Sequence, residues 1–472
     1  MKTYIKTFKS LVFASLFIVV ASCSIDDIKP LNQLTQENTI RDEVSAQQVL
    51  NGVYDLGREF DVNSFPLYLA AYGNEGMITG SLSGGTGYNT NEVPVDNPFL
   101  ASLYNGHYKI INSCNFLIKG LEAGDAVDIS DQRRDEMISE AKFQRAFAYF
   151  NLLRYFGQFY DLSSTYGVVL RTEFSTELTA DPRNSVQEVY NFIQSDLQYA
   201  AANGPQFIQH FYSGRLAAQA LLAKVELYMG NYGVAATLAN QVVNNTEGYA
   251  LEAQYSSIFA NRFNSSEVIF APFSTSGSEA GSSMDLINRT SYSETLRSTA
   301  DAQVGLAADG DLTGAGANYD PRFSYAYSDA TQGVNMQGKY PFIGSSSSEG
   351  NTLYHLRLAE IYLVHAEAEA RRTGGDLDVA LASLNAIRDR VAVTPKTLSD
   401  AATLLEDIRQ EKLLELFFEN GESWFDVVRY DALGNLSAST VKASVTSEKQ
   451  FVLPIPTQVI IGNTNVVQNP DY

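Results

Sequence analysis

Two pairs of amphipathic helical segments, each pair joined by a glycine turn, constrain the fold of this chain most strongly. In the first pair, residues 214–243, one apolar stripe recurs at helical spacing: Leu216, Ala220, Ala223 and Leu227. The dipeptide Gly230-Asn231 interrupts this pattern, and a second stripe follows over residues 232–243. The pattern predicts a helix, a tight turn and a second helix that packs back on the first.

The same arrangement recurs over residues 354–390, where Gly374-Gly375 supplies the turn. Alanines at the crossing positions allow close helix approach, and the two hairpins resemble tetratricopeptide repeats, for which at least three repeats are expected. Two further helix pairs are predicted, residues 44–59 with 103–121 and residues 140–155 with 185–201; Ser185 and Glu188 form a capping-box pattern at the start of the last helix.

Long segments of low helical propensity separate these helices. They cover residues 73–98, 271–350 and 431–472 and are rich in Gly, Ser, Thr, Asn and Tyr. Segments this long are not simple connections within a domain, and loops carried by a rigid scaffold commonly form binding surfaces. We therefore expect a loop-rich face on a helical body.

The amino terminus carries an export pattern. Lysines at positions 2, 6 and 9 precede the apolar run 11–21, which is too short to span a bilayer and is typical of a signal peptide. The stretch Val20-Ala21-Ser22-Cys23 resembles the bacterial lipobox, in which the cysteine is acylated and becomes the new N-terminus. We predict a signal peptide at residues 1–22, a lipidated terminus and tether at 23–40 and one domain at 41–472.

The net charge limits which partners the chain can bind, and the cysteine content limits which covalent links can stabilise it. The formal net charge is −21, and an acidic surface repels phosphate backbones, so no nucleic-acid partner is expected. If Cys23 carries lipid, Cys114 is the remaining cysteine, which leaves no pair for a disulfide. With 45% hydrophobic residues, the chain has ample material for a large core.

The carboxyl-terminal segment carries a defined sequence pattern, whereas the ends of many chains are poorly ordered. Pro454 and Pro456 fix φ and remove backbone donors, which favours an extended segment lying against the protein body. Asn469-Pro470 indicates a turn, and Tyr472 supplies an aromatic anchor. We expect this tail to be docked.

Several motifs, in one order along the chain, resemble the SusD/RagB family of surface lipoproteins from Bacteroidetes nutrient-uptake systems. The family's signature helix is similar to IRQEKLLELFFENGESWFDVVR at residues 408–429, and its repeat helix is similar to RLAEIYLVHAEA at 357–368. Its arginine- and aromatic-rich helix is similar to AKFQRAFAYF at 141–150, and its usual ending is similar to LPIP at 453–456 followed by QNPDY at 468–472. Relatives often have glycine where this tail has Asp471.

The resemblance implies a mostly α-helical, SusD-like fold with about four tetratricopeptide-like hairpins, a loop-rich variable face and few short strands. It implies a non-catalytic, lipid-anchored protein of the outer membrane, facing outward, that captures an oligosaccharide and delivers it to a SusC-like TonB-dependent transporter. Two alternatives stay open: a RagB-like lid that binds oligopeptides, and a structural partner of the transporter without its own ligand.

Within the signature helix, Glu411, Glu415 and Glu419 recur every four residues on one face, where basic neighbours can pair with them. We expect these carboxylates to serve the structure. The resemblance assigns Trp424, the only tryptophan, to the core, so a sugar-binding surface must use other aromatic residues.

Patterns typical of enzymes are not found in the sequence. The histidines are scattered, none in a His-Glu-x-x-His motif: His107, His210, His355 and His365. No Gly-x-Ser-x-Gly elbow occurs, and the glycine-rich segments lack phosphate-loop spacing. We expect no enzyme activity and no cofactor, although paired carboxylates of a glycosidase cannot be recognised in so acidic a sequence.

One segment has a weak calcium-loop pattern. Oxygen-bearing side chains occupy positions one, three, five and twelve of the loop, with glycine at position six: Asp309, Asp311, Thr313 and Asp320. The loop ends in Asp where Glu is usual, and flanking helices are not evident, so a solvated turn is the alternative. The nearby Asp320-Pro321-Arg322-Phe323 resembles a family feature and is expected to lead into a short strand.

Tyrosines in or beside the irregular segments are the candidate sugar platform: Tyr72, Tyr88, Tyr292, Tyr319, Tyr325 and Tyr327. Sugar rings pack their C–H faces on aromatic planes while polar neighbours bind the hydroxyls. The candidate polar neighbours are Asn74, Glu75 and Asn89. We expect Tyr88 and Tyr292 to be the most exposed of these rings; ordinary core packing is the alternative for any one of them.

Overall fold

The computed structural model describes residues 39–177, 179–275, 287, 289–303, 309–312, 318–326, 338–342 and 350–472. The expected signal peptide and Cys23 lie outside the described residues, so the boundaries at residues 22 and 40 stay predictions.

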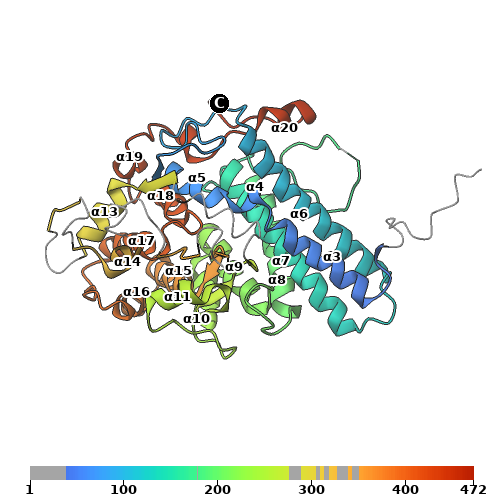
Figure 1. Cartoon of the computed structure of the whole chain (residues 1–472), viewed down its shortest axis with the longest axis horizontal. Coiled ribbons are helices and arrows are strands. Elements are labelled where there is room, and N and C mark those ends of the chain that lie inside the picture. The colour runs from blue at the N-terminus through green and yellow to red at the C-terminus, as the bar shows by residue number, and fades with distance from the viewer. Residues whose placement is uncertain are drawn as a thin grey trace, which may run out of the picture.

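Helices account for most of the described chain, with a few short strands (Figure 1). The helices are α3 (Glu43–Leu56), α4 (Phe60–Asn63), α5 (Phe65–Tyr72), α6 (Pro98–Ala123), α7 (Asp131–Phe156), α8 (Val186–Asn203), α9 (Arg215–Tyr228), α10 (Tyr232–Val243), α11 (Tyr255–Asn261), α13 (Glu294–Asp301), α14 (Pro321–Ala326), α15 (Leu358–Arg371), α16 (Leu377–Arg390), α17 (Ala401–Leu416), α18 (Glu422–Ala432), α19 (Ala438–Val441) and α20 (Thr457–Gly462), with 3-10 turns η2 (Arg262–Asn264) and η5 (Glu448–Phe451). The strands are β1 (Gly76–Ile78), β2 (Val268–Phe270), β3 (Thr290–Tyr292) and β4 (Leu356–Arg357).

The hairpin formed by α9 and α10 follows directly from its sequence pattern. The stripe residues Leu216, Ala220, Ala223 and Leu227 are all buried. Gly230 has φ +77°, a left-handed conformation that glycine adopts without strain, and it turns the chain between the two helices. The predicted hairpin is confirmed, as is the second hairpin of α15 and α16, where Gly374 has φ +70°.

The hairpins stack on one another. Helix α7 packs between α6 and α8, α8 contacts α9, α10 contacts α15, and α15 contacts both α16 and α17. Figure 1 shows the long helices α3, α6, α7 and α8 side by side at one end and α13 to α17 at the other. The predicted pairings of α3 with α6 and of α7 with α8 are confirmed; the likeness to tetratricopeptide repeats stays a prediction.

Local signals also place helix ends. The hydroxyl of Ser185 accepts a hydrogen bond from the amide of Glu188, and the Glu188 carboxylate accepts one from the Ser185 amide. This reciprocal capping box, which the sequence predicts, satisfies two otherwise unpaired donors at the start of α8.

Two small antiparallel sheets join distant segments. Strand β1 pairs with β3 in a register that places Gly76 opposite Tyr292, and β2 pairs with β4 in a register that places Val268 opposite Arg357. One expectation is wrong here: Asp320-Pro321 opens helix α14 and does not lead into a strand. Proline fits the first helical position because that position has no intrahelical partner for an amide.

The carboxyl-terminal tail is docked, as the sequence predicts. The Leu453 amide donates to the Tyr155 carbonyl at 2.7 Å. Asn469 Nδ2 donates to the carbonyls of Phe156 and Leu453, and the Tyr472 hydroxyl donates to the Val452 carbonyl at 2.9 Å. These bonds fix the tail against the end of α7. Among the helices described, none has the length and apolarity that crossing a membrane would require.

Candidate ligand-binding site

The predicted tyrosine platform is largely part of the core. The exposed fractions are 1% for Tyr72, 0% for Tyr88, 3% for Tyr292 and 4% for Tyr319. The expectation that Tyr88 and Tyr292 are the most exposed rings is therefore wrong. Tyr325 is 37% exposed, and Tyr327 lies outside the described residues.

Hydrogen bonds explain why these rings are held inside. The Tyr72 hydroxyl donates to the Gln450 carbonyl at 2.7 Å, and the Tyr292 hydroxyl donates to the Ala326 carbonyl at 3.1 Å. Buried tyrosines commonly satisfy the hydroxyl this way while the ring fills the core. The segments around them are irregular in composition, yet they fold against the helices.

The expected polar neighbours serve the backbone. Asn74 Oδ1 accepts from the Ser423 hydroxyl at 2.7 Å, and Glu75 Oε2 accepts from the Phe418 amide at 2.7 Å. Both residues are buried, and desolvation raises the pKa of Glu75 to about 7. Asn89 is exposed, but its amide bonds the backbone N–H and C=O of Ile78. Burial removes Asn74 and Glu75 from a surface site.

The calcium-loop pattern does not assemble in the described part of the chain. Both Asp320 oxygens accept from the Arg322 guanidinium, at 2.9 Å each, so a cation partner already occupies this carboxylate. Asp309 accepts from the amides of Asp311 and Asn318 as a turn does. Thr313 lies outside the described residues, and within those that are described no group of three or more His, Cys, Asp or Glu side chains could hold a metal.

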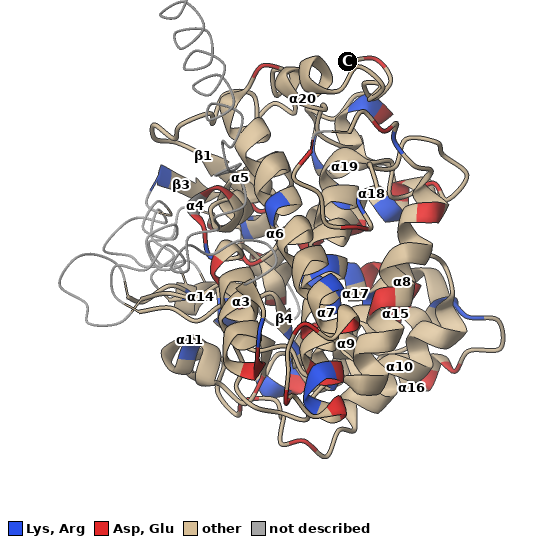
Figure 2. Cartoon of the chain, turned by 90° about the vertical axis from the view of Figure 1, so that its right-hand side faces the viewer, with Lys and Arg blue, Asp and Glu red and all other residues tan. Residues whose placement is uncertain are grey.

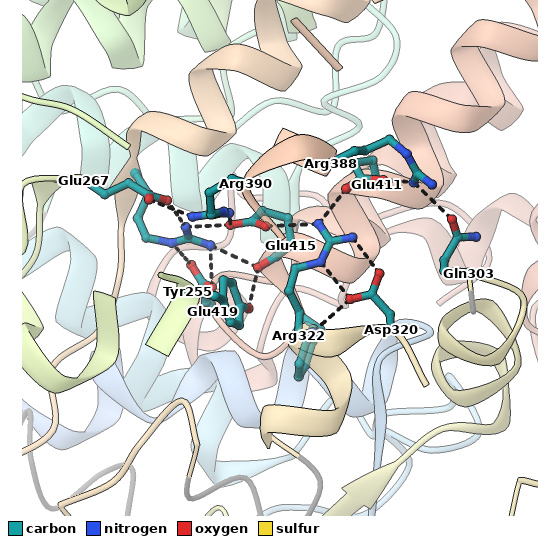
Figure 3. A network of polar contacts seen from close by, with 12 residues as sticks. Tyr255, Glu267, Gln303, Asp320, Arg322, Arg388, Arg390, Glu411, Glu415 and Glu419 are labelled. Carbon is teal, nitrogen blue, oxygen red and sulfur yellow. Dashed lines mark hydrogen bonds and ion pairs between the residues drawn. The ribbon is translucent and has the colours of Figure 1, made fainter. Parts of the chain in front are cut away.

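Glu415 lies at the centre of a buried ion network (Figure 3). Its Oε1 accepts from Arg357 Nη1 at 2.9 Å and from Arg390 Nη2 at 2.5 Å, and its Oε2 accepts from Arg322 Nη1 at 3.1 Å. Desolvation alone would raise the pKa of Glu415, but the three guanidinium groups outweigh it and hold this pKa well below its usual range.

The other two carboxylates of the row extend the network. Glu411 binds Arg388 Nη1 at 2.6 Å, and Glu419 Oε1 binds Lys339 Nζ at 2.8 Å. Figure 2 shows basic and acidic segments adjoining one another around α15 and α17. The structural role predicted for this row is confirmed, but the expected single helix face is not: α17 ends at Leu416, so Glu411 and Glu415 belong to it and Glu419 follows it.

A separate cavity of about 610 Å³ has the features of a ligand site. It lies among α3, α6 and α7, and its walls are completed by residues 57, 58, 62, 66, 211, 212, 270, 272, 273, 355 and 420. Its volume is within the range of about 300–1,000 Å³ typical of small-molecule pockets.

Aromatic rings form the outer wall of this cavity. Phe273 is 38% exposed and packs on Phe211 with ring centroids 5.1 Å apart, while Phe211 contacts Tyr212 at 4.8 Å. The Arg58 guanidinium carbon lies 5.8 Å from the Phe273 ring centroid, and Arg58 also pairs with Asp55. The wall therefore offers broad aromatic surfaces beside the Arg58 guanidinium, whose charge is paired with Asp55.

Two neutral imidazoles line the inner part. Desolvation lowers the pKa of both His107 and His355 to about 4, so neither carries charge near pH 7. His107 Nδ1 lies 2.9 Å from the Leu103 carbonyl, which can only accept; Nδ1 therefore carries the proton and Nε2 is the acceptor nitrogen. The His355 ring stands 5.0 Å from the Phe147 ring.

Side-chain amides line the same cavity. Gln144 lines the cavity, and its Nε2 has no hydrogen-bond partner within the part of the chain that the structure describes. Asn151 Oδ1 accepts from Arg154 Nη2 at 2.6 Å. These imidazole and amide side chains are uncharged donors and acceptors.

Arg154 also reaches the cavity, but its charge is compensated. Its Nη1 donates to Glu422 Oε1 at 2.7 Å, and its guanidinium carbon lies 4.3 Å from the ring centroids of both Phe150 and Phe425. Desolvation opposes ionisation of Glu422, but Arg154 and Lys224 dominate and lower the pKa of Glu422 to about 2. Arg154 and Glu422 therefore stay ionised and bound to each other.

Sequence reasoning missed this cavity, although α7 carries a signal for it. Gln144, Phe147, Asn151 and Arg154 recur at spacings of three and four, so polar groups recur on one face of the helix within its buried part, which begins at Met137. Such a stripe indicates either a buried polar network or a pocket. The partner segments come from positions as distant as residues 58, 273 and 420, which periodicity cannot bring together.

Family comparisons match most of the chain. The family model described as "SusD family" matches residues 310–472, and a second, described as "Starch-binding associating with outer membrane", matches residues 27–227. A curated relative, SusD-like protein P2 of Formosa agariphila, is 24% identical over 98% of this chain and 99% of its own length.

Solved structures share the fold. A SusD superfamily protein from Bacteroides thetaiotaomicron has a TM-score of 0.77 and 24% identity, covering 91% of this chain and 100% of that one. A structure described as a laminarin binding SusD-like protein has a TM-score of 0.69 and 24% identity, covering 92% of this chain and 100% of that one.

Proposed function

This chain belongs to the SusD/RagB family, and from that premise we propose that it is a non-catalytic surface lipoprotein that captures an oligosaccharide. In this proposal Cys23 carries the lipid anchor in the outer membrane. The captured oligosaccharide passes to a SusC-like TonB-dependent transporter.

The cavity beside α7 is the observation that carries the proposal. Sugar rings combine apolar C–H faces with many hydroxyl groups, each of which both donates and accepts hydrogen bonds. Phe273, Phe211 and Phe147 supply ring surfaces, and His107 and Gln144 supply neutral polar groups. The starch-binding description of the family model and the laminarin-binding neighbour support the same ligand class.

The binding step is tested with the lipid-free chain, residues 24–472, titrated against a panel of oligosaccharides and a panel of oligopeptides. We expect binding to oligosaccharides. Binding to peptides alone would favour the RagB-like alternative. Binding to neither panel would leave only a structural role.

The delivery step is tested separately. Outer membranes solubilised in mild detergent should yield a TonB-dependent transporter with the tagged full-length protein. Recovery of the tagged protein without any such transporter would contradict the handover.

A further inference from the structure

We propose that the cavity beside α7 is a neutral-sugar subsite: it takes an uncharged ring of the captured oligosaccharide and discriminates against rings that carry carboxylate, sulfate or amino groups. This inference rests on the proposed function and assigns its ligand contacts to residues outside the predicted tyrosine platform.

The charges around the cavity are already paired, and that pairing is the basis of the discrimination. The buried Arg154 is held by Glu422 and Asn151, whereas Arg58 forms a surface pair with Asp55, whose side chain is 69% exposed. An anionic ring packed beside Arg154 would lose its hydration without gaining a cation, unless it broke the buried pair. An ammonium group there would meet the same cost, because Arg154 already engages Glu422. Burying an uncompensated charge is far more costly than burying a hydroxyl that finds a partner.

The polar groups that line the cavity suit hydroxyl groups. His107 presents Nε2 as an acceptor, because Nδ1 donates to the Leu103 carbonyl. Gln144 also lines the cavity, although its Nε2 is itself fully buried and has no partner in the described chain. A hydroxyl group can donate to the imidazole nitrogen, whereas a carboxylate cannot donate.

The aromatic walls suit a ring in place of an extended polar chain. Phe273 and Phe211 stand at the exposed side, and Phe147 packs beside His355 further in. A ring with an apolar face can pack on these planes while its edge meets the amide and imidazole groups.

The test uses chemically matched probes. Neutral hexasaccharides of glucose, mannose and galactose are compared with the same hexasaccharides oxidised at C6 to uronates, each titrated calorimetrically into the lipid-free chain. We expect the oxidised form of any bound hexasaccharide to bind at least about tenfold more weakly, because its carboxylate lacks a cation in the cavity. Equal or tighter binding of the oxidised form would overturn the inference.

Variants locate the binding within the molecule. Phe273→Ala should weaken binding of the neutral hexasaccharide by roughly five- to a hundredfold, the range expected for loss of one stacked ring. Gln144→Leu should weaken it by up to about tenfold, because the cavity wall loses a polar side chain. Phe207→Ala is the matched control: Phe207 is 41% exposed, close to the 38% of Phe273, but does not line the cavity.

The outcomes separate this inference from the proposed function. Neutral hexasaccharide binding that Phe273→Ala and Gln144→Leu both leave unchanged would overturn the cavity assignment while glycan capture stands. Weakening by Phe207→Ala equal to that by Phe273→Ala would also count against it. If no oligosaccharide binds, both the inference and the proposed function fail.

Discussion

The Trp424 indole meets the Tyr72 ring edge to face, with centroids 5.5 Å apart and planes at 86°. Trp424 is 1% exposed and lies in the first turn of α18, while Tyr72 ends α5. The pair joins the signature helix to a segment about 350 positions earlier in the chain. The core assignment of the only tryptophan is thereby confirmed, and the same contact explains why Tyr72 offers no free face to a ligand.

Trp424→Ala should destabilise the fold without altering the ligand site. Truncation of a buried aromatic residue costs about 3–5 kcal/mol, because contacts are lost and a cavity remains. Urea denaturation followed by circular dichroism measures the free energy of unfolding, and calorimetry of the folded fraction measures affinity. Loss of oligosaccharide binding with unchanged stability would contradict the core assignment.

Two buried tyrosines provide a matched pair of conservative changes. Tyr72→Phe should cost about 1 kcal/mol, because the Gln450 carbonyl loses its donor. Tyr88→Phe should cost nothing or stabilise slightly, because the Tyr88 hydroxyl is buried with no hydrogen-bond partner among the described residues. Thermal unfolding of both variants tests the difference; equal losses would show that the hydroxyl groups are in equivalent surroundings.

Glu415→Ala should be among the most damaging single changes. Removing one partner of a buried ion pair costs about 3–5 kcal/mol, since the remaining charges lose their compensation. Lys109→Ala is the control, because Lys109 is 62% exposed and its pair with Glu59 should contribute at most about 1 kcal/mol. Comparable unfolding free energies for the two variants would contradict the role given to the network.

Glu140 should make stability depend on pH near neutrality. Burial raises the pKa of Glu140 from its ordinary value of 4.5 to about 7, although Tyr54 donates to its Oε2 at 2.7 Å and Arg133 lies nearby. The folded state therefore keeps a proton that the unfolded state loses above pH 4.5. This contribution to stability is complete below that pH and is lost as the pH rises through about 7.

The Gln side chain stays neutral at every pH, so Glu140→Gln should not lose this stability as the pH rises. Its free energy of unfolding relative to the natural chain should therefore increase from pH 5 to pH 8, by on the order of 3 kcal/mol at most. Urea denaturation at pH 5 and at pH 8 measures the two free energies. Glu136→Gln, one turn earlier and only partly buried, is the control. Identical pH profiles for Glu140→Gln and the natural chain would exclude this role.

Cys23→Ala should leave export intact and release the protein from the outer membrane, or stall its processing. The reason is that several acyl chains on this cysteine would otherwise make the anchoring stable. Fractionation of cells and mass spectrometry of the mature N-terminus provide the measurement. Membrane retention of the variant, with no lipid on the natural protein, would contradict the anchor.

The sequence allowed the fold to be predicted where local patterns determine it. The apolar stripes of α9 and α10 and the turn at Gly230 need only neighbouring residues, and Glu411 and Glu415 of α17 are visible as a spacing of four. Burial of Tyr88 and Tyr292 was not predictable from their glycine- and serine-rich surroundings, since those segments become ordered through contacts with distant residues such as Gln450. The cavity was not predicted for the same reason: Gln144, Phe273 and Asn420 line one cavity only after the hairpins have packed.

The ion network around Glu415 has a consequence for cooperativity. In a stacked array of hairpins, each repeat contacts its neighbours, and unfolding can proceed from an end. Here Glu415 binds Arg322 of α14, Arg357 of β4 and Arg390 of α16. Releasing any one of these segments would leave charge buried and uncompensated, so the segments should unfold together as one unit and partly opened forms of this region should be rare.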